Sequence, residues 1–96
     1  MPAALSVTWD YLDRLHGPFH DAVMWLDIEG SELEALYGAN GLFTRKAILL
    51  VNVEMASRLE HKNARIMQFM DIHGFKVARD WNVNEAYLDR IFVLRS

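Results

Sequence analysis

Apolar and polar residues alternate along this chain with two different periods, which predict strands in some segments and helices in others. Ala22–Leu26 and Ala47–Val53 are nearly continuous apolar runs bounded by turn residues, a pattern typical of strands buried on both faces in a parallel sheet. Phe75–Trp81 and Arg90–Arg95 alternate apolar with polar residues, with residues 82–89 between them as a loop. These two segments predict an antiparallel hairpin, so about four strands are expected.

Three further segments have the spacing of apolar residues that amphipathic helices show. One precedes the first strand, one follows it and the longest follows the second strand: Val7–His16, Ser31–Tyr37 and Ala56–His73. Gly17-Pro18 is expected to stop the first helix, because proline does not continue one. The order predicts one α/β domain over residues 1–96, in which two parallel strand–helix units have right-handed crossovers.

The expected ends of two helices carry residues with known roles at helix termini. Ser31 and Glu34 have the spacing of a capping box, in which the two side chains satisfy backbone N–H groups of the first turn. Gly38 fits the left-handed residue that closes a helix. Gly74 is expected to end the longest helix.

Composition and charge exclude several classes of protein. The chain is 52% hydrophobic, which is high for a soluble domain, and its net charge is −3 with both signs mixed along it. That mixture lacks the basic face that nucleic acids require. The absence of cysteine excludes disulfide scaffolds and thiolate metal sites. No signal peptide or membrane-length apolar stretch is seen, so we expect a cytoplasmic chain with no nucleic-acid or membrane partner.

Acidic residues gather where the first two apolar runs end. Asp27, Glu29 and Glu32 follow the first run, and Glu54 follows the second. Ligands of open α/β sheets bind beyond the carboxyl ends of strands, where a carboxylate can take a proton from a hydroxyl or join others in binding Mg²⁺. A structural role stays open, because negative charge is favourable at a helix start and Gly30 suits a tight turn.

Three short segments follow one another in an order shared with a known family. They are Trp25–Glu32 (Trp-Leu-Asp-Ile-Glu-Gly-Ser-Glu), Leu36–Ala39 (Leu-Tyr-Gly-Ala) and Ile48–Glu54 (Ile-Leu-Leu-Val-Asn-Val-Glu). With these segments the chain resembles the C-terminal half of the FkbM-type S-adenosylmethionine-dependent methyltransferases. The family usually has a lysine where this chain has Trp25, so a cation near the site is missing.

The resemblance implies a fold, a reaction and a set of site residues. The fold is α/β, half of the three-layer Rossmann-like methyltransferase architecture with about three helices. The reaction is methyl transfer from S-adenosylmethionine, with a hydroxyl as the expected acceptor. Asp27, Glu29 and Glu54 are implied as catalytic residues, and Asp27, Gly30 and Glu32 as contacts to the cofactor. No metal ligand is implied.

The half of such a fold that holds most of the cofactor is not recognisable in these residues. No Gly-x-Gly turn occurs among the five glycines, Gly17, Gly30, Gly38, Gly41 and Gly74. We therefore expect the isolated chain to be inactive and strand 22–26 to be an apolar edge, which is an association site. The expected partner is a second copy, in a homodimer, or a chain that supplies the rest of the sheet.

Two other functions are compatible with the same residues. The first is a small non-enzymatic α/β protein derived from this fold, acting as a homo-oligomeric assembly module. The second is a hydrolase or phosphoryl-transfer domain that uses the acidic strand ends. No nucleophile motif such as Gly-x-Ser-x-Gly supports the second.

Overall fold

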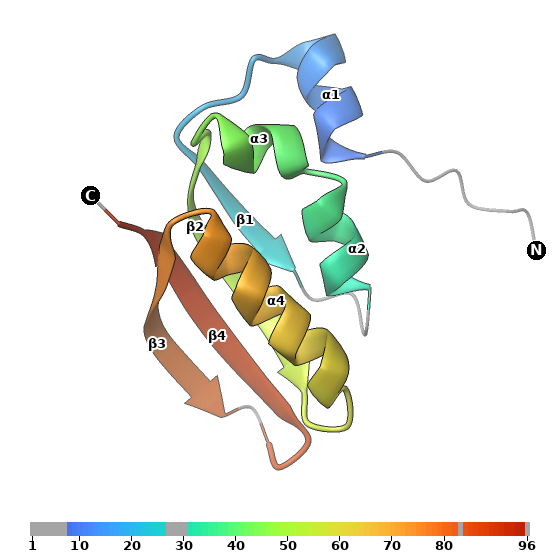
Figure 1. The fold of residues 1–96 in the computed structure, drawn as a ribbon, viewed down its shortest axis with the longest axis vertical. Coiled ribbons are helices and arrows are strands. Elements are labelled where there is room, and N and C mark those ends of the chain that lie inside the picture. The colour runs from blue at the N-terminus through green and yellow to red at the C-terminus, as the bar shows by residue number, and fades with distance from the viewer. Residues whose placement is uncertain (1–7, 27–30, 83, 96) are drawn as a thin grey trace, which may run out of the picture.

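The computed structural model describes residues 8–26, 31–82 and 84–95 of the chain. The helices and strands in these residues are, in chain order (Figure 1), α1 (Trp9–His16), β1 (Ala22–Leu26), α2 (Glu32–Tyr37), α3 (Asn40–Thr44), β2 (Ile48–Ala56), α4 (Glu60–Ile72), β3 (Phe75–Asn82) and β4 (Tyr87–Leu94). The expected α/β class is confirmed, and α3 is an addition that the apolar pattern does not predict. Within the described residues, none of the helices has the length and apolar character that crossing a membrane requires.

The strands form one mixed sheet in the order β1-β2-β4-β3. β1 and β2 run parallel, with Met24 beside Val51 and Leu26 beside Val53. β4 is antiparallel to β2 on one side and to β3 on the other. The prediction of a parallel pair followed by an antiparallel hairpin is therefore confirmed, and β4 is the strand inserted in reverse.

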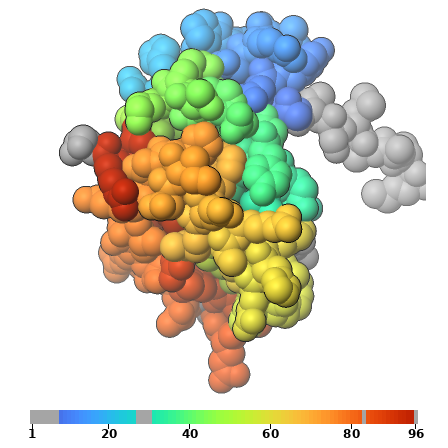
Figure 2. Space-filling view, in the orientation of Figure 1, coloured from blue at the N-terminus to red at the C-terminus, as the bar shows by residue number. Residues whose placement is uncertain are grey.

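Helices α2, α3 and α4 cover one face of this sheet, and α4 passes in front of β2 in Figure 1. Alternate strand residues turn toward these helices, since successive side chains of a strand point to opposite faces. The resulting core contains Met24, Leu26, Val51, Val53 and Phe92 from the strands and Leu33, Leu36, Leu42, Phe43, Ile66, Phe69 and Met70 from the helices. Figure 2 shows this face filled by helix side chains.

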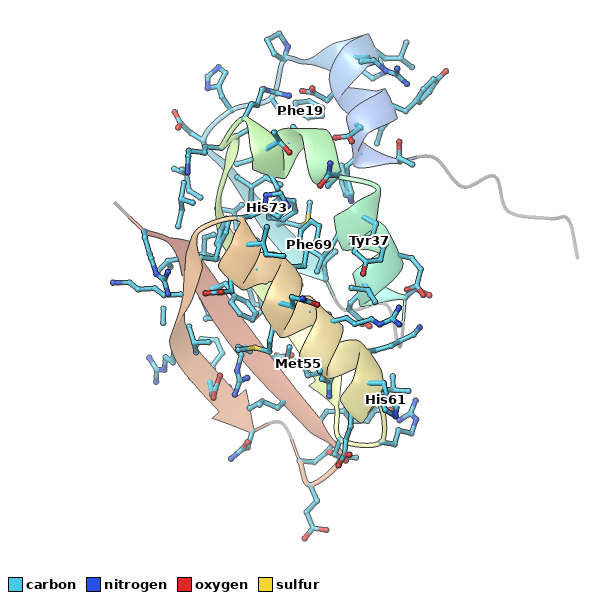
Figure 3. The ribbon with its side chains drawn as sticks, viewed as in Figure 1. Phe19, Tyr37, Met55, His61, Phe69 and His73 are labelled. Carbon is cyan, nitrogen blue, oxygen red and sulfur yellow. The ribbon has the colours of Figure 1, made fainter. Side chains whose placement is uncertain are left out.

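An aromatic cluster joins α3 and α4 to β3 inside the core. The ring of Phe43 lies 5.1 Å from that of Phe69 and 5.6 Å from that of Phe75, both edge to face. Phe69 also meets Tyr37 of α2 at 5.6 Å (Figure 3). Edge-to-face contacts add about 0.5–1.5 kcal/mol each beyond burial, so this cluster ties the helices to the sheet.

The opposite face of the sheet is left uncovered by α2, α3 and α4. On β1 the side chains of Val23 and Trp25 are 65% and 61% exposed, whereas their neighbours Met24 and Leu26 are buried. The prediction that Ala22–Leu26 is buried on both faces is therefore wrong. A run of apolar residues indicates that both faces of a strand are apolar. Which of the two faces is buried depends on the segments that pack against the strand.

Two helix ends differ from the sequence prediction. Ser31 is the N-cap of α2 but its side chain makes no capping hydrogen bond, so the capping box with Glu34 does not form. Glu34 instead accepts a hydrogen bond from Nζ of Lys62 on α4, at 3.1 Å. Gly38 has right-handed backbone, with φ −69°, because the chain continues through the buried Ala39 into α3.

α3 begins where a residue from a distant part of the chain caps it. Asp10 of α1 accepts hydrogen bonds from the backbone N–H groups of Gly41 at 2.9 Å and Leu42 at 3.2 Å. A carboxylate that accepts such bonds satisfies donors of the first helical turn and suits the helix dipole. Because Asp10 lies in another helix, the local pattern of residues 40–44 does not predict α3.

The remaining element ends agree more closely with expectation. Gly74 has a φ of +84° and closes α4. α4 begins at Glu60 rather than at Ala56, since β2 continues through Ala56. The side-chain amide of Asn63 donates to the carbonyl of Ala56 at 2.8 Å and fixes this turn. β3 and β4 are also longer than the expected strands.

A salt bridge fastens the segment before β1 to α1 and α3. Nη1 and Nη2 of Arg45 donate to the two carboxylate oxygens of Asp13, at 2.7 and 2.8 Å. Asp13 also accepts from the backbone N–H of Phe19 at 2.7 Å, and Arg45 donates to the Phe19 carbonyl at 2.6 Å. The hydrogen bonds from Arg45 and from the Phe19 backbone lower the pKa of Asp13 below its ordinary value.

The Asp13–Arg45 contact predicts a loss of stability in acid. Because folding lowers the pKa of Asp13 from its ordinary value of 3.8, its contribution is fully present above that value and disappears as the pH falls through the lower folded pKa. Asp13→Asn is expected to lower the free energy of unfolding near neutral pH. The gap to the parent protein should close below both pKa values, as measured by urea unfolding; a gap independent of pH would contradict this account.

The backbone of Gly74 predicts a second stability effect. Gly74→Ala should lower the free energy of unfolding by about 1–2 kcal/mol, the cost of left-handed backbone for a residue with a Cβ. An added Cβ there would meet its nearest atoms at 3.7 and 3.8 Å, which are ordinary contact distances. The loss of stability therefore measures backbone strain and not a steric clash. Gly74→Asn is the matched comparison and should lose less stability in the same urea titration, because asparagine adopts left-handed backbone more readily than alanine.

Candidate functional site

The carboxyl ends of β1 and β2 lie at the same edge of the sheet because the two strands are parallel. Leu26, the last residue of β1, pairs with Val53, and Glu54 is the next residue of β2. Asp27, Glu29 and Gly30 follow Leu26 in the sequence and lie outside the described residues. The structure therefore brings the strand that leads into the acidic segment beside Glu54.

Glu54 faces the side of the sheet that α2, α3 and α4 leave uncovered, since its neighbours Val53 and Met55 are buried toward the helices. Directly opposite it on β4 lies Asp89, and both residues are half-buried. Like charges that face each other across two strands repel. The two acidic side chains lie on neighbouring strands at the carboxyl end of β2.

Glu32 lies in the first turn of α2 and is only 4% exposed. Negative charge is favourable at that end of a helix, which gives Glu32 a structural role. Its predicted contact with a cofactor stays a prediction, as do the roles of Asp27, Glu29 and Gly30.

Asn52 is a buried polar residue that the sequence reasoning did not single out. It lies in the central strand β2, beside Trp25 of β1 and Ile91 of β4, and is fully buried. Neither its Oδ1 nor its Nδ2 has a hydrogen-bond partner. Buried polar atoms are seldom left in this state. The signal available in the sequence was a lone amide within an apolar run.

A cleft of about 290 Å³ lies between α4 and the β3–β4 hairpin, on the helix side of the same sheet edge. Met55, Met67 and Leu88 line it together with Arg90. Nε and Nη2 of Arg90 donate to the two carboxylate oxygens of Asp80, at 2.7 and 2.9 Å, and these bonds lower the pKa of Asp80. Because Asp80 neutralises the guanidinium, the cleft is largely apolar and offers little to an anion.

No group of three histidine, aspartate or glutamate side chains in the described ranges is arranged to hold a metal ion. His61 and His73 lie near opposite ends of α4 (Figure 3). They are therefore too far apart to share one ion, and a metal centre is not part of the described site.

A comparison with known families identifies the chain. Residues 6–77 match the family model of the Methyltransferase FkbM domain, and this match spans more than half of the 96 residues. The chain belongs to the FkbM methyltransferase family. The match includes the acidic segment after β1 and Glu54 at the end of β2. No curated protein and no solved structure matches the chain significantly.

Membership of the FkbM family implies S-adenosylmethionine as cofactor, and the described residues fit only part of it. Glu54 and Asp89 lie opposite each other at the carboxyl end of β2, the region where ligands of open α/β sheets bind. In the family pattern a Gly-rich turn helps to hold the nucleoside, and no Gly-x-Gly turn occurs in this sequence. Among the described residues of this FkbM chain, the side chains that suit part of the cofactor are therefore the acidic ones at the carboxyl end of β2.

The unpartnered amide of Asn52 predicts a gain in stability on its removal. Asn52→Val should raise the free energy of unfolding by about 1–3 kcal/mol, because it deletes two buried groups without hydrogen bonds and valine suits a strand. Asn52→Asp, which adds a charge at the same place, is the control and should destabilise the fold. Chemical denaturation measures both; a loss of stability in Asn52→Val would mean that the amide has a partner in solution.

Proposed function

We propose that this chain forms the acceptor-binding part of an S-adenosylmethionine-dependent methyltransferase that acts on a hydroxyl group. The observation that carries the proposal is the family match over the acidic segment and Glu54, combined with the parallel pairing of Leu26 with Val53. That pairing supports a common site for Asp27 and Glu54, because each directly follows one of the two paired residues in the sequence.

In this proposal Glu54 is the general base. A hydroxyl loses its proton when its oxygen gains a methyl group, and a positioned carboxylate can take that proton. The position of Glu54 supports this role, because it is half-buried at the end of β2, next to the residue that pairs with the last residue of β1. Asp27 and Glu29 hold the acceptor close to the reacting carbon, a positioning effect that is large in two-substrate reactions.

S-adenosylmethionine would supply the methyl group when bound. Asp27, Gly30 and Glu32 contact its methionine portion in our proposal, and polypeptide other than β1–β4 binds its nucleoside. The absence of a Gly-x-Gly turn from the 96 residues supports this division. We therefore infer that the chain by itself binds the cofactor weakly and does not turn over.

A cofactor titration tests this proposal. In ¹H–¹⁵N spectra of the full chain, S-adenosylmethionine should shift amide signals of residues 26–32 and 53–56, with a dissociation constant on the order of millimolar (about −4 kcal/mol). Asp27→Asn should weaken binding, whereas Glu54→Gln, which alters the base alone, should leave it unchanged. Unchanged spectra at millimolar cofactor would overturn cofactor binding at this edge, and shifts confined to α1 or the β3–β4 hairpin would place it elsewhere.

A non-enzymatic assembly role is the second candidate. The large exposed side chains of Val23 and Trp25 favour it, because exposed apolar residues at a sheet edge mark association sites. This candidate predicts association without cofactor binding, so the titration above separates the two.

A further inference from the structure

The cleft between α4 and the β3–β4 hairpin plays no part in the proposed methyl transfer. It has a volume of about 290 Å³ and lies on the helix side of the sheet, whereas Glu54 faces the uncovered side. β2, α4 and both strands of the hairpin contribute residues to it. Clefts that bind small molecules are mainly apolar and contain a few fixed polar groups, and this cleft has both properties.

Thioethers supply much of the apolar surface of the cleft. Met55 of β2 is buried, Met67 of α4 is half-buried, and Leu88 of β4 lines the cleft with them. The sulfur of methionine makes favourable contacts with aromatic rings, and its flexible side chain adapts to the shape of a ligand. This part of the lining therefore favours a ring over a strongly hydrated group.

The guanidinium of Arg90 is held in place at the cleft by three hydrogen bonds. Nε and Nη2 donate to the carboxylate of Asp80 at 2.7 and 2.9 Å, and Nη1 donates to Sδ of Met67 at 3.3 Å. A guanidinium is planar and stacks on aromatic faces. Its pairing with Asp80, and the carboxylate of Glu85 in the same lining, disfavour an anionic ligand. A neutral planar group is thus the ligand that Arg90 suits.

The side-chain amide of Asn63 gives the cleft a fixed hydrogen-bond acceptor. Its Nδ2 donates to the carbonyl of Ala56 at 2.8 Å, which fixes the orientation of the amide. Within the part of the chain that the structure describes, its Oδ1 accepts no hydrogen bond. An amide oxygen accepts readily from a hydroxyl, so a hydroxyl group on the ligand has a partner here.

We propose that this cleft binds one neutral aromatic ring that carries a hydroxyl group, as a phenol does. The ring stacks on the guanidinium of Arg90 and contacts the sulfur atoms of Met55 and Met67, while its hydroxyl donates to Oδ1 of Asn63. The size is suitable, because a cavity of about 150 Å³ encloses benzene and the cleft has about 290 Å³. The inference does not depend on methyl transfer, and its failure would leave the proposed acceptor edge untouched.

The methionine methyl groups provide the test. In the full chain with ¹³C-labelled methionine methyls, 4-methylphenol should shift the signals of Met55 and Met67. The signals of Met24 and Met70, which lie in the core, should stay in place. A dissociation constant on the order of millimolar is expected, since so small a ligand makes few contacts. In ¹⁵N spectra the side-chain amide of Asn63 should shift at the same concentrations.

Two further ligands test the chemistry of the cleft. 4-Methylcyclohexanol keeps the hydroxyl but has no aromatic face, and it should bind about tenfold more weakly because it loses the contacts to the guanidinium and the sulfur atoms. 4-Methylbenzoate keeps the ring but is an anion, and it should not bind at these concentrations.

Two variants test the location. Ala64 is an exposed residue of α4 that lines the cleft, so Ala64→Phe should fill the cleft and abolish the shifts. Gln68→Phe is the matched control, because Gln68 is exposed on the same helix and lies outside the lining, and it should leave binding unchanged. Circular dichroism checks that both variants fold, and the comparison of the three ligands needs neither variant.

Four results would overturn the proposal. One is the absence of shifts at Met55 and Met67 with 4-methylphenol at about ten times the expected dissociation constant. Another is a set of shifts of equal size at Met24 and Met70, which would mean that the ligand acts on the core. The third is binding of 4-methylcyclohexanol or 4-methylbenzoate as tight as that of the phenol. The last is unchanged binding in a folded Ala64→Phe variant.

Discussion

Burial of one face of the β1-β2-β4-β3 sheet beneath α2, α3 and α4 is the interaction on which the rest of this structure depends. It brings Val51 and Val53 of the central strand into the same core as Phe43 and Phe69. Since side chains alternate along a strand, the same burial turns Asn52 and Glu54 to the other face. The side chains available for chemistry or association are thus selected by the packing of the helices.

The parallel pairing of β1 with β2 gives the fold its functional edge. Parallel neighbours require a crossover, which α2 and α3 provide here, and their carboxyl ends then meet. For this reason the acidic segment after β1 and Glu54 belong to one region, although they are far apart in the sequence. β4 brings Asp89 to the same place by running antiparallel to β2. The carboxyl end of β1 leads into the acidic segment, and Trp25 lies in the same strand. A segment that paired with the outer side of β1 would therefore lie close to both.

Much of the architecture was predictable because it follows from short-range patterns. The apolar runs locate β1 and β2, the alternating segments locate β3 and β4, and Gly74 ends α4 as expected. α3 was not predictable, because its cap is the carboxylate of Asp10 in another helix. The left-handed conformation expected for Gly38 was wrong, because the chain continues into α3 and keeps Gly38 in right-handed helical backbone.

Of the candidate site, likewise, one part was predictable from the sequence and another part was not. Glu54 stands out in the sequence as an acidic residue at a strand end, and the family match over residues 6–77 agrees with the acidic segment as a marker of ancestry. Asp89 and Asn52 did not stand out, because their importance lies in what faces them across the sheet. Register and coverage are properties of several segments together, and no window of sequence contains them.

The sequence by itself determined the order of helices and strands, the direction in which the first two strands pair and the acidic character of their ends. Those properties arise from periodicity and from residues adjacent in the chain, which act locally. The tertiary structure alone decided that one face of β1 is covered while Val23 and Trp25 of the other are exposed. It also decided that Asn52 is buried without a partner. The physical reason is that burial depends on which distant segments pack against a surface, and apolar side chains alike in sequence become core or exposed surface accordingly.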